Sequence, residues 1–311
     1  MSSGTAVATT LDRPACNACG ESMTPLLESR DYNRGVSGGP FHYHRCTKCG
    51  LIALVNIPED LGRYYVSGYH EIPPTQEDIE RRVEHERYKI ELVRQFVDSG
   101  NLLEIGPSWG AFCLLAKRHG FSVEAIERDP DCYEFLRSKV GVNAVLAKGD
   151  AISLDLTSKP DVIALWHVIE HLRDPWRLLK SAAERLAPGG ILVVATPNPD
   201  ASQFRLFGRY WGHLDAPRHV NLIPPALLRE RMRLAGLNAL VFTTIDPGSK
   251  ECSVFGWRKS LSNLVTNSAL KRGIYYLGRL AADLAQLVES REGMGAAYTA
   301  IFRKPRKAGL E

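Results

Sequence analysis

The sequence predicts an α/β protein: a mostly parallel, doubly wound sheet with helices on both faces, preceded by a smaller N-terminal domain. From residue 100 to residue 195, short apolar segments alternate with helical segments of about 10–15 residues, the pattern of strands joined by crossover helices. Nearer the N-terminus, four cysteines form two Cys-x-x-Cys pairs, which is typical of a small domain held by a metal ion. The chain of 311 residues is long enough for both domains.

Composition and charge narrow the classes of function. Lys and Arg number 39 and Asp and Glu number 35, so the formal net charge of +4 is too small to indicate a nucleic-acid partner, and none is expected. There is no apolar run of 18 residues and no basic segment followed by an apolar one at the N-terminus. We therefore expect neither a signal peptide nor a transmembrane segment. The seven cysteines fit a reducing compartment, and we expect a cytoplasmic protein.

The paired cysteines carry the clearest chemical signal. Thiolates three positions apart on a tight turn can hold one metal ion from one side, and a second such turn completes a tetrahedron. Glycine follows each pair and 26 residues separate the pairs, which is close to the spacing of zinc ribbons. Redox pairs or unrelated cysteines are the alternative, but the shared Cys-x-x-Cys-Gly form favours a structural Zn²⁺. The expected ligands are Cys16, Cys19, Cys46 and Cys49.

The order of these patterns gives the expected domain boundaries and elements. The divisions are a disordered lead at 1–13, the zinc ribbon at 14–57, a connector and one polar helix at 58–99, and the sheet domain at 100–311 with a helical insertion at about 250–292. Strands are expected at 101–105, 122–126, 144–146, 161–166, 191–195, 239–244 and 297–303. Helices are expected at 112–119, 130–140, between 166 and 186, and at 274–289.

The loop after the first of these strands contains an acidic residue followed by glycines. A dinucleotide fingerprint would need glycine where the chain has Ser108 and Ala111, which argues against a nicotinamide cofactor. The template of an acidic residue followed by G-x-G-x-G fits better, with Glu104, Gly106 and Gly110 in place and Ser108 replacing the middle glycine. Because ligands of parallel sheets bind at the carboxyl ends of the strands, this loop is a candidate binding site.

Two further strand ends carry carboxylates. Glu127 ends the second strand, about 20 residues after the glycine loop, where it could accept both hydroxyls of a ribose. Asp150 follows the third strand, where it could accept the exocyclic amine of adenine. The alternatives are that Glu127 is an ordinary surface glutamate and that Asp150 is a solvated aspartate in a turn.

Together these residues resemble a known family. Glu104 to Gly110, Glu127, Asp150 and the segments 167–172, 186–190 and 196–198 occur in the order and spacing of class I S-adenosylmethionine-dependent methyltransferases, in the subgroup related to ubiquinone-biosynthesis O-methyltransferases. The resemblance covers about residues 100–245. It implies a Rossmann-like doubly wound methyltransferase sheet preceded by the zinc ribbon. The residues that it places at the cofactor are Glu104, Gly106, Gly110, Glu127, Asp150, Ala151 and His167.

The combination of ribbon and sheet domain resembles bacterial methyltransferases of sugar, polysaccharide and natural-product pathways. The resemblance implies S-adenosylmethionine as cofactor and a small-molecule, sugar or glycan acceptor, with O-methylation expected. A non-catalytic protein of the same fold, whose ribbon docks a partner, is the alternative. The intact cofactor motif favours the enzyme.

A histidine cluster follows the fourth strand. His167 and His171 are four positions apart and would share one face of a helix that starts there, with Glu170 within reach of both. Some relatives bind a divalent ion here with two glutamates and a histidine, but His167 occupies the first glutamate position. Three interpretations of this cluster remain. Its residues could brace the start of the helix, one histidine could act as a general base, or Glu170 and His171 could hold a second divalent metal. The candidate bases are His167, His171 and His219.

The roles of two later segments are not decided by the sequence. The aromatic stretch after the fifth strand, from Phe204 to His213, fits either an acceptor lid or ordinary packing. The amphipathic helix at 274–289 could cover the active site, form a homodimer contact, touch a membrane surface or pack on its own domain.

Overall fold

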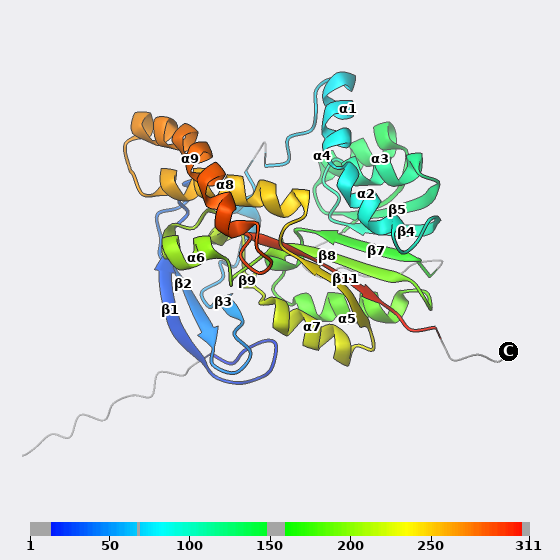
Figure 1. The fold of residues 1–311 in the computed structure, drawn as a ribbon, viewed down its shortest axis with the longest axis horizontal. Helices are drawn as coiled ribbons and strands as arrows, with labels where there is room; N and C mark the ends of the chain where they lie inside the picture. The colour runs from blue at the N-terminus through cyan, green and yellow to red at the C-terminus, as the bar shows by residue number, and fades with distance from the viewer. Residues whose placement is uncertain (1–13, 67–68, 148–158, 307–311) are drawn as a thin grey trace, which may run out of the picture.

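The computed structural model describes residues 14–66, 69–147 and 159–306, apart from the side chains of residues 268 and 269. A seven-stranded sheet forms its centre (Figure 1). The strands are β4 (Gly100–Ile105), β5 (Phe121–Glu127), β6 (Asn143–Leu146), β7 (Val162–Trp166), β8 (Ile191–Pro197), β10 (Asn238–Thr243) and β11 (Ala297–Arg303).

The order of these strands is β10-β11-β8-β7-β4-β5-β6. The strands from β4 to β8 pair in parallel, whereas β11 runs antiparallel to both of its neighbours, β8 and β10. Every residue of β7 and β8 is buried, which explains why their sequences are almost uninterrupted apolar runs. The predicted α/β fold, with a mostly parallel sheet, is confirmed.

Helices cover both faces of this sheet. The helices of one face are α1 (Gln76–His85), α2 (Arg87–Arg94) and α3 (Ala111–Arg118), with α4 (Pro130–Phe135) continuing into a single π-helical turn at Leu136–Val140. The helices of the other face are α5 (Pro175–Arg185) and α7 (Pro225–Leu234). Each face therefore buries its own apolar cluster against the shared sheet.

Two predicted helices differ in the structure. The single polar helix expected within 58–99 is broken into α1 and α2 at Glu86, whose backbone leaves the helical region with ψ of 3°. The helix expected directly after β7 is only a short 3₁₀ turn at Ile169–His171. The α-helix begins later, at Pro175, because Asp174 caps it by accepting from the Arg177 amide and proline suits the first helical turn.

The N-terminal segment contributes most of a second, four-stranded sheet. Its strands are β1 (Met23–Ser29), β2 (Phe41–Cys46) and β3 (Ile52–Leu54), and the fourth is β9 (Asn221–Leu222) from the sheet domain. β3 pairs antiparallel with β9. A buried cluster joins the two parts, with Tyr43 and Ile52 on one side and Trp211 and Leu214 on the other. The N-terminal segment thus shares both a sheet and a core with the larger domain.

A helical hairpin lies between β10 and β11. It consists of α8 (Pro247–Asn263) and α9 (Ser268–Glu289), and α8 packs near the short helix α6 (Ser202–Phe207). In Figure 1 the hairpin projects at the upper left, beyond the edge of the large sheet. Among the described residues, none of the helices is both long enough and apolar enough to cross a membrane.

Candidate active site

A cavity of about 1130 Å³ opens at the carboxyl ends of the parallel strands. Gly106 follows β4, Glu127 ends β5, His167 follows β7 and Pro197 ends β8, and all four residues line the cavity. This is the edge at which parallel sheets bind ligands. Typical small-molecule sites occupy about 300–1,000 Å³, so the cavity has room for a cofactor and an acceptor together.

The loop after β4 needs glycine at two positions. Gly106 and Gly110 have φ of 68° and 93°, in the left-handed region. A Cβ atom at Gly106 would lie 2.8 Å from Val168 Cγ2, and one at Gly110 would lie 2.5 Å from Leu136 Cδ2. Ser108 is also left-handed, with φ of 56°, which explains why the motif usually has glycine there.

Glu127 fixes this loop from the end of β5. One carboxylate oxygen accepts from the Ser108 amide at 2.8 Å, and the other accepts from the amides of Arg128 and Asp129 at 2.6 and 2.8 Å. The side chain is buried, yet it lines the cavity. The carboxylate is therefore held in a fixed orientation beside the glycine loop before any ligand arrives.

Two of the other residues expected at the cofactor, Glu104 and Gly110, do not line the cavity. Glu104 is buried beneath the loop and accepts from the Cys113 thiol at 2.9 Å. Burial outweighs the thiol bond and raises the pKa of Glu104 to about 7. Asp150 and Ala151 lie outside the described residues. Of the expected cofactor residues, the structure thus brings Gly106, Glu127 and His167 to one cavity.

The expectation that His167 and His171 share a helix face is wrong. His167 is left-handed, with φ of 57°, and only the 3₁₀ turn follows it. Its ring lies between Cys252 Sγ at 3.8 Å and a Glu170 carboxylate oxygen at 3.4 Å. Burial opposes its charged form, but the Cys252 sulfur and the Glu170 carboxylate outweigh burial and raise the pKa of His167 to about 10. A protonated imidazole cannot accept a proton, which argues against His167 as general base.

Glu170 instead faces two other histidines. One of its carboxylate oxygens and one ring nitrogen each of His171 and His219 all lie within 4.8 Å of one another. Glu170 is fully buried; Oε2 accepts from the Thr196 hydroxyl at 3.0 Å, while Oε1 has no hydrogen bond among the described residues. Burial disfavours the carboxylate, but His167 outweighs burial and lowers the pKa of Glu170 to about 2.

The tautomers of both histidines follow from their carbonyl partners. His219 Nδ1 lies 2.7 Å from the His213 carbonyl, and His171 Nδ1 lies 3.1 Å from the Arg218 carbonyl and 3.0 Å from the Tyr65 hydroxyl. A carbonyl only accepts, so Nδ1 of His219 carries the proton and its Nε2 keeps a lone pair. The same tautomer of His171 suits both of its partners, since a hydroxyl can accept as well as donate. This is the orientation of metal-binding histidines, which donate their other N–H to a carbonyl. The three residues therefore fit a divalent ion.

A further part of the cavity wall comes from residues outside the glycine loop and the histidine cluster. Asn33 and Arg34 come from the N-terminal segment, Tyr69 from the connector, and Lys259 and Tyr275 from the hairpin. Each belongs to a segment with its own local structure, and no spacing in the sequence links them. His213, at the end of the aromatic stretch, lines the cavity, whereas Trp211 is buried in the shared core.

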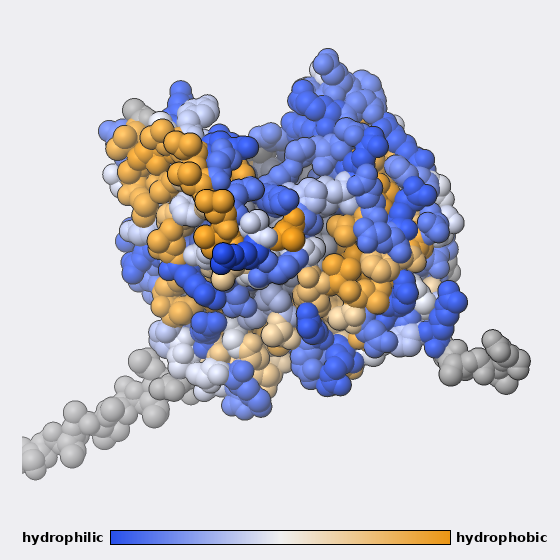
Figure 2. All heavy atoms as spheres, viewed as in Figure 1, coloured by the Kyte–Doolittle hydropathy of each residue, from blue (hydrophilic) through white to orange (hydrophobic). Residues whose placement is uncertain are grey.

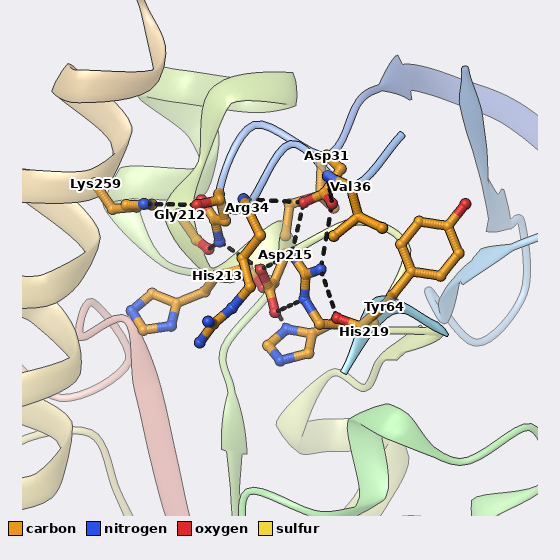
Figure 3. Close-up of polar contacts among 12 residues, drawn as sticks. Asp31, Arg34, Val36, Tyr64, Gly212, His213, Asp215, His219 and Lys259 are labelled. Atoms are coloured by element: carbon orange, nitrogen blue, oxygen red, sulfur yellow. Dashed lines mark hydrogen bonds and ion pairs between the residues drawn. The ribbon is translucent and has the colours of Figure 1, made fainter. Parts of the chain in front are cut away.

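A buried network of ion pairs and hydrogen bonds connects the residues of this part of the cavity wall (Figure 3). Arg218 is fully buried and donates to Asp31 at 2.7 Å and to Asp215 at 2.8 Å. Asn33 donates to the Asp215 carboxylate, and the Lys259 ammonium group donates to the Asn33 carbonyl at 2.9 Å. Arg218 lowers the pKa of Asp215 well below its ordinary value, against the effect of burial. The network fixes the N-terminal segment against the cavity wall.

The four paired cysteines form a separate cluster in the N-terminal segment. Their sulfur atoms pair at 3.6 Å (Cys16 with Cys49) and 3.5 Å (Cys19 with Cys46). Tetrahedral zinc with Zn–S bonds of about 2.3 Å separates its sulfurs by about 3.8 Å, so this cluster fits the ion. The predicted juxtaposition of Cys16, Cys19, Cys46 and Cys49 is confirmed.

Comparisons with known proteins agree with this geometry. The family model of a methyltransferase domain matches residues 76–241. A ubiquinone biosynthesis O-methyltransferase from Caulobacter vibrioides is 31% identical over 111 residues, covering 31% of this chain and 40% of that protein. One from Xanthomonas euvesicatoria pv. vesicatoria is 25% identical over 167 residues, covering 50% of this chain and 68% of that protein. The chain spans about two fifths of the length of the Caulobacter relatives that it matches.

Among solved structures, one from Galdieria sulphuraria, described as a candidate sarcosine dimethylglycine methyltransferase, superposes with a TM-score of 0.50. It is 15% identical, and the match covers 74% of this chain and 88% of that one, which supports the fold alone. The family match itself extends over more than half of the chain and includes the glycine loop, Glu127 and the histidine cluster. On these grounds, the chain belongs to the methyltransferase domain family.

Proposed function

We propose that the protein transfers a methyl group from S-adenosylmethionine to a hydroxyl of a small-molecule, sugar or glycan acceptor. The observation that carries this proposal is one cavity lined by two chemically different groups of residues. Gly106, Ser108 and Glu127 form one group, and Glu170, His171 and His219 form the other. Family membership and the resemblance to O-methyltransferases support the same assignment.

Methyl transfer asks the protein to align the acceptor, exclude water and remove a proton. The bound cofactor supplies a methyl group already activated on a sulfonium. Gly106 lets the backbone approach that cofactor, and Glu127 accepts from its ribose hydroxyls, because a carboxylate held by backbone amides is well placed for this. The residues on the other side of the cavity then orient the acceptor hydroxyl toward the methyl group.

Glu170, His171 and His219 would hold a divalent ion at that hydroxyl. Such an ion would lower the pKa of the bound hydroxyl by acting as a Lewis acid. Burial lowers the pKa of His171 to about 4, so its imidazole is neutral at physiological pH, as a ligand must be. If the site works without an ion, His219 is the best placed candidate base, because the bond from its Nδ1 to the His213 carbonyl leaves a lone pair on Nε2.

The part of the cavity wall that would bind the acceptor favours a polar molecule that carries a negative charge. Arg34 lies over the Tyr69 ring, with its guanidinium carbon 4.6 Å from the ring centroid, and Lys259 lines the same wall. Tyr275 adds another aromatic surface on which a sugar ring could stack. A sugar or natural-product acceptor bearing a carboxylate or phosphate would satisfy these groups.

The cysteine cluster is proposed to hold a structural Zn²⁺. Its role in this function is indirect, because Asn33 and Arg34 reach the cavity from the same N-terminal segment. The ion would stabilise the segment, and the segment would supply part of the acceptor wall.

Calorimetric titration with S-adenosylhomocysteine tests the cofactor assignment. One molecule should bind per chain, and Glu127→Ala should weaken binding by about 2–4 kcal/mol, or about 30- to 1,000-fold, because two charge-assisted hydrogen bonds are lost. Glu124→Ala is the matched control: Glu124 lies on the same strand, is half-buried and does not line the cavity. Unchanged affinity in Glu127→Ala would refute the role of Glu127. Absence of binding to the parent protein would favour the non-catalytic alternative.

A further inference from the structure

The outer face of α9 is covered by exposed apolar side chains. Figure 2 shows them gathered at the upper left, over the α9 region of Figure 1. Their exposed fractions run from 45% to 79%. Apolar side chains this exposed are common singly, but a continuous group on one helix usually marks an interaction surface. The side chains are Leu270, Tyr276, Leu277, Leu280, Leu284, Leu287 and Val288.

The opposite face of α9 packs against other parts of the same chain. Gly278 lies so close to α8 that a Cβ atom there would be 2.5 Å from Arg258 Cα. Ala282 is buried, and the buried Glu289 accepts from Trp257 Nε1 at 2.9 Å and from the Ser202 hydroxyl at 2.9 Å. These contacts fix the rotation of α9, so its leucine face points away from the rest of the described chain.

The spacing of the leucines is that of a paired helix. Leu270, Leu277 and Leu284 follow each other at intervals of seven, and Leu280 and Leu287 form a second row three positions later. Two apolar rows with a period of 3.5 residues form the seam of a two-stranded coiled coil.

The charges on α9 distinguish a protein partner from a lipid surface. Helices that lie on membranes carry many Lys and Arg residues on their polar face. Over its full length, α9 has three basic residues, Lys271, Arg272 and Arg279, and two acidic ones, Asp283 and Glu289. Arg279 is paired with Asp283 at 3.1 Å. Three positive charges against two negative ones leave the helix a formal charge of +1, which is a weak attraction to anionic lipids.

We propose that the leucine face of α9 binds the same face of a second copy of this chain, forming a two-fold symmetric homodimer. A two-fold interface uses one self-complementary patch on both subunits, which a leucine seam provides. The seven exposed side chains present on the order of 900 Å², and a stable interface buries about 800 Å² per partner. Tyr275 lines the cavity from the other side of α9, so pairing leaves the acceptor end accessible.

Sedimentation equilibrium of the full-length protein tests the proposal. The parent chain should be a dimer at micromolar concentration, and Leu284→Glu should weaken association at least 100-fold, because it places two charges in the seam. Leu234→Glu on α7 is the matched control, since Leu234 is 63% exposed and Leu284 is 66% exposed. The control variant should remain dimeric. Leu277→Glu should repeat the effect if Leu284→Glu folds poorly by circular dichroism.

Three results would overturn the homodimer. The first is a parent chain that is monomeric at 100 micromolar. The second is a dimer that survives both leucine substitutions, which would place the interface elsewhere. The third is flotation of the parent chain with phosphatidylcholine–phosphatidylglycerol vesicles that Leu284→Glu abolishes and Leu234→Glu does not, which would assign the face to a lipid surface. Loss of S-adenosylhomocysteine binding is measured separately, so the dimer and the proposed activity can fail independently.

Discussion

Ser108 shows how one residue can depart from a motif and keep its geometry. It occupies the left-handed position where the motif has glycine, with φ of 56°. Its amide donates to Glu127, and its hydroxyl lies 3.0 Å from His70 Nδ1. These contacts offset the cost of a left-handed serine, which is about 1–2 kcal/mol. Serine at this position of the motif thus has a structural basis.

Glu104, another single residue, leads to a prediction about how the free energy of unfolding depends on pH. In the cofactor-free native state its pKa is raised from 4.5 to about 7, so it keeps a proton that the unfolded chain releases near pH 4.5. The free energy of unfolding should therefore fall as the pH rises from 4.5 through 7. Glu104→Gln removes this loss and should be about 2–3 kcal/mol more stable than the parent at pH 8, with little difference at pH 4.5.

Urea denaturation of the cofactor-free protein at both pH values measures this difference. Glu124→Gln on the same strand should show no comparable dependence on pH, because Glu124 is only half-buried. A Glu104→Gln variant that is equally destabilised at both pH values would contradict the prediction.

Glu170 leads to a prediction about metal binding. If Glu170, His171 and His219 hold a divalent ion, adding Mg²⁺ or Mn²⁺ at about ten times its Kd should stabilise the native state by about 1.4 kcal/mol. For a chain of this size that is a rise in Tm of about 2–4 °C. Glu170→Gln should abolish the rise, because it removes the only charged ligand. A thermal-shift titration measures it, and a rise of equal size in the variant would rule out this site.

At the scale of elements, the zinc ribbon has little core of its own. β1 and β2 have several exposed residues, and the cysteine cluster lies where the chain turns between strands. Segments this small usually need their metal ion to fold. If the cluster holds Zn²⁺, the turns that carry the cysteines are the part of this segment whose order depends most on the ion, because the strands also pack on the larger domain.

We predict that Cys46→Ser lowers the zinc content from one ion per chain toward zero and disorders the ribbon strands. Affinity for S-adenosylhomocysteine should be largely kept, because Gly106 and Glu127 belong to the other sheet. Affinity for the acceptor should fall, because Arg34 lines its end of the cavity. Elemental analysis and calorimetry check the first two statements. Full zinc in a variant lacking Cys16, Cys19, Cys46 and Cys49 would move the ion to another site.

At the scale of the whole molecule, the two sheets form one structure. The pairing of β3 with β9 and the Arg218 network connect residues that lie more than 150 positions apart. The cavity is lined by residues from the N-terminal segment, the connector and the hairpin together. If the hairpin also joins two copies of the chain, each dimer would carry two cavities, each on the side of α9 that faces away from the partner.

The sequence by itself determined the strands of the large sheet, the four-cysteine cluster and the glycine loop. Each depends on local periodicity or on residues close together in the chain. Only the tertiary structure decided that Glu170 meets His219, and that Asn33 donates to the carbonyl of Gly212, 179 positions later. It also replaced the expected helix start at His167 with a short turn. Contacts over such separations leave no spacing signal, because they depend on how whole elements pack against one another.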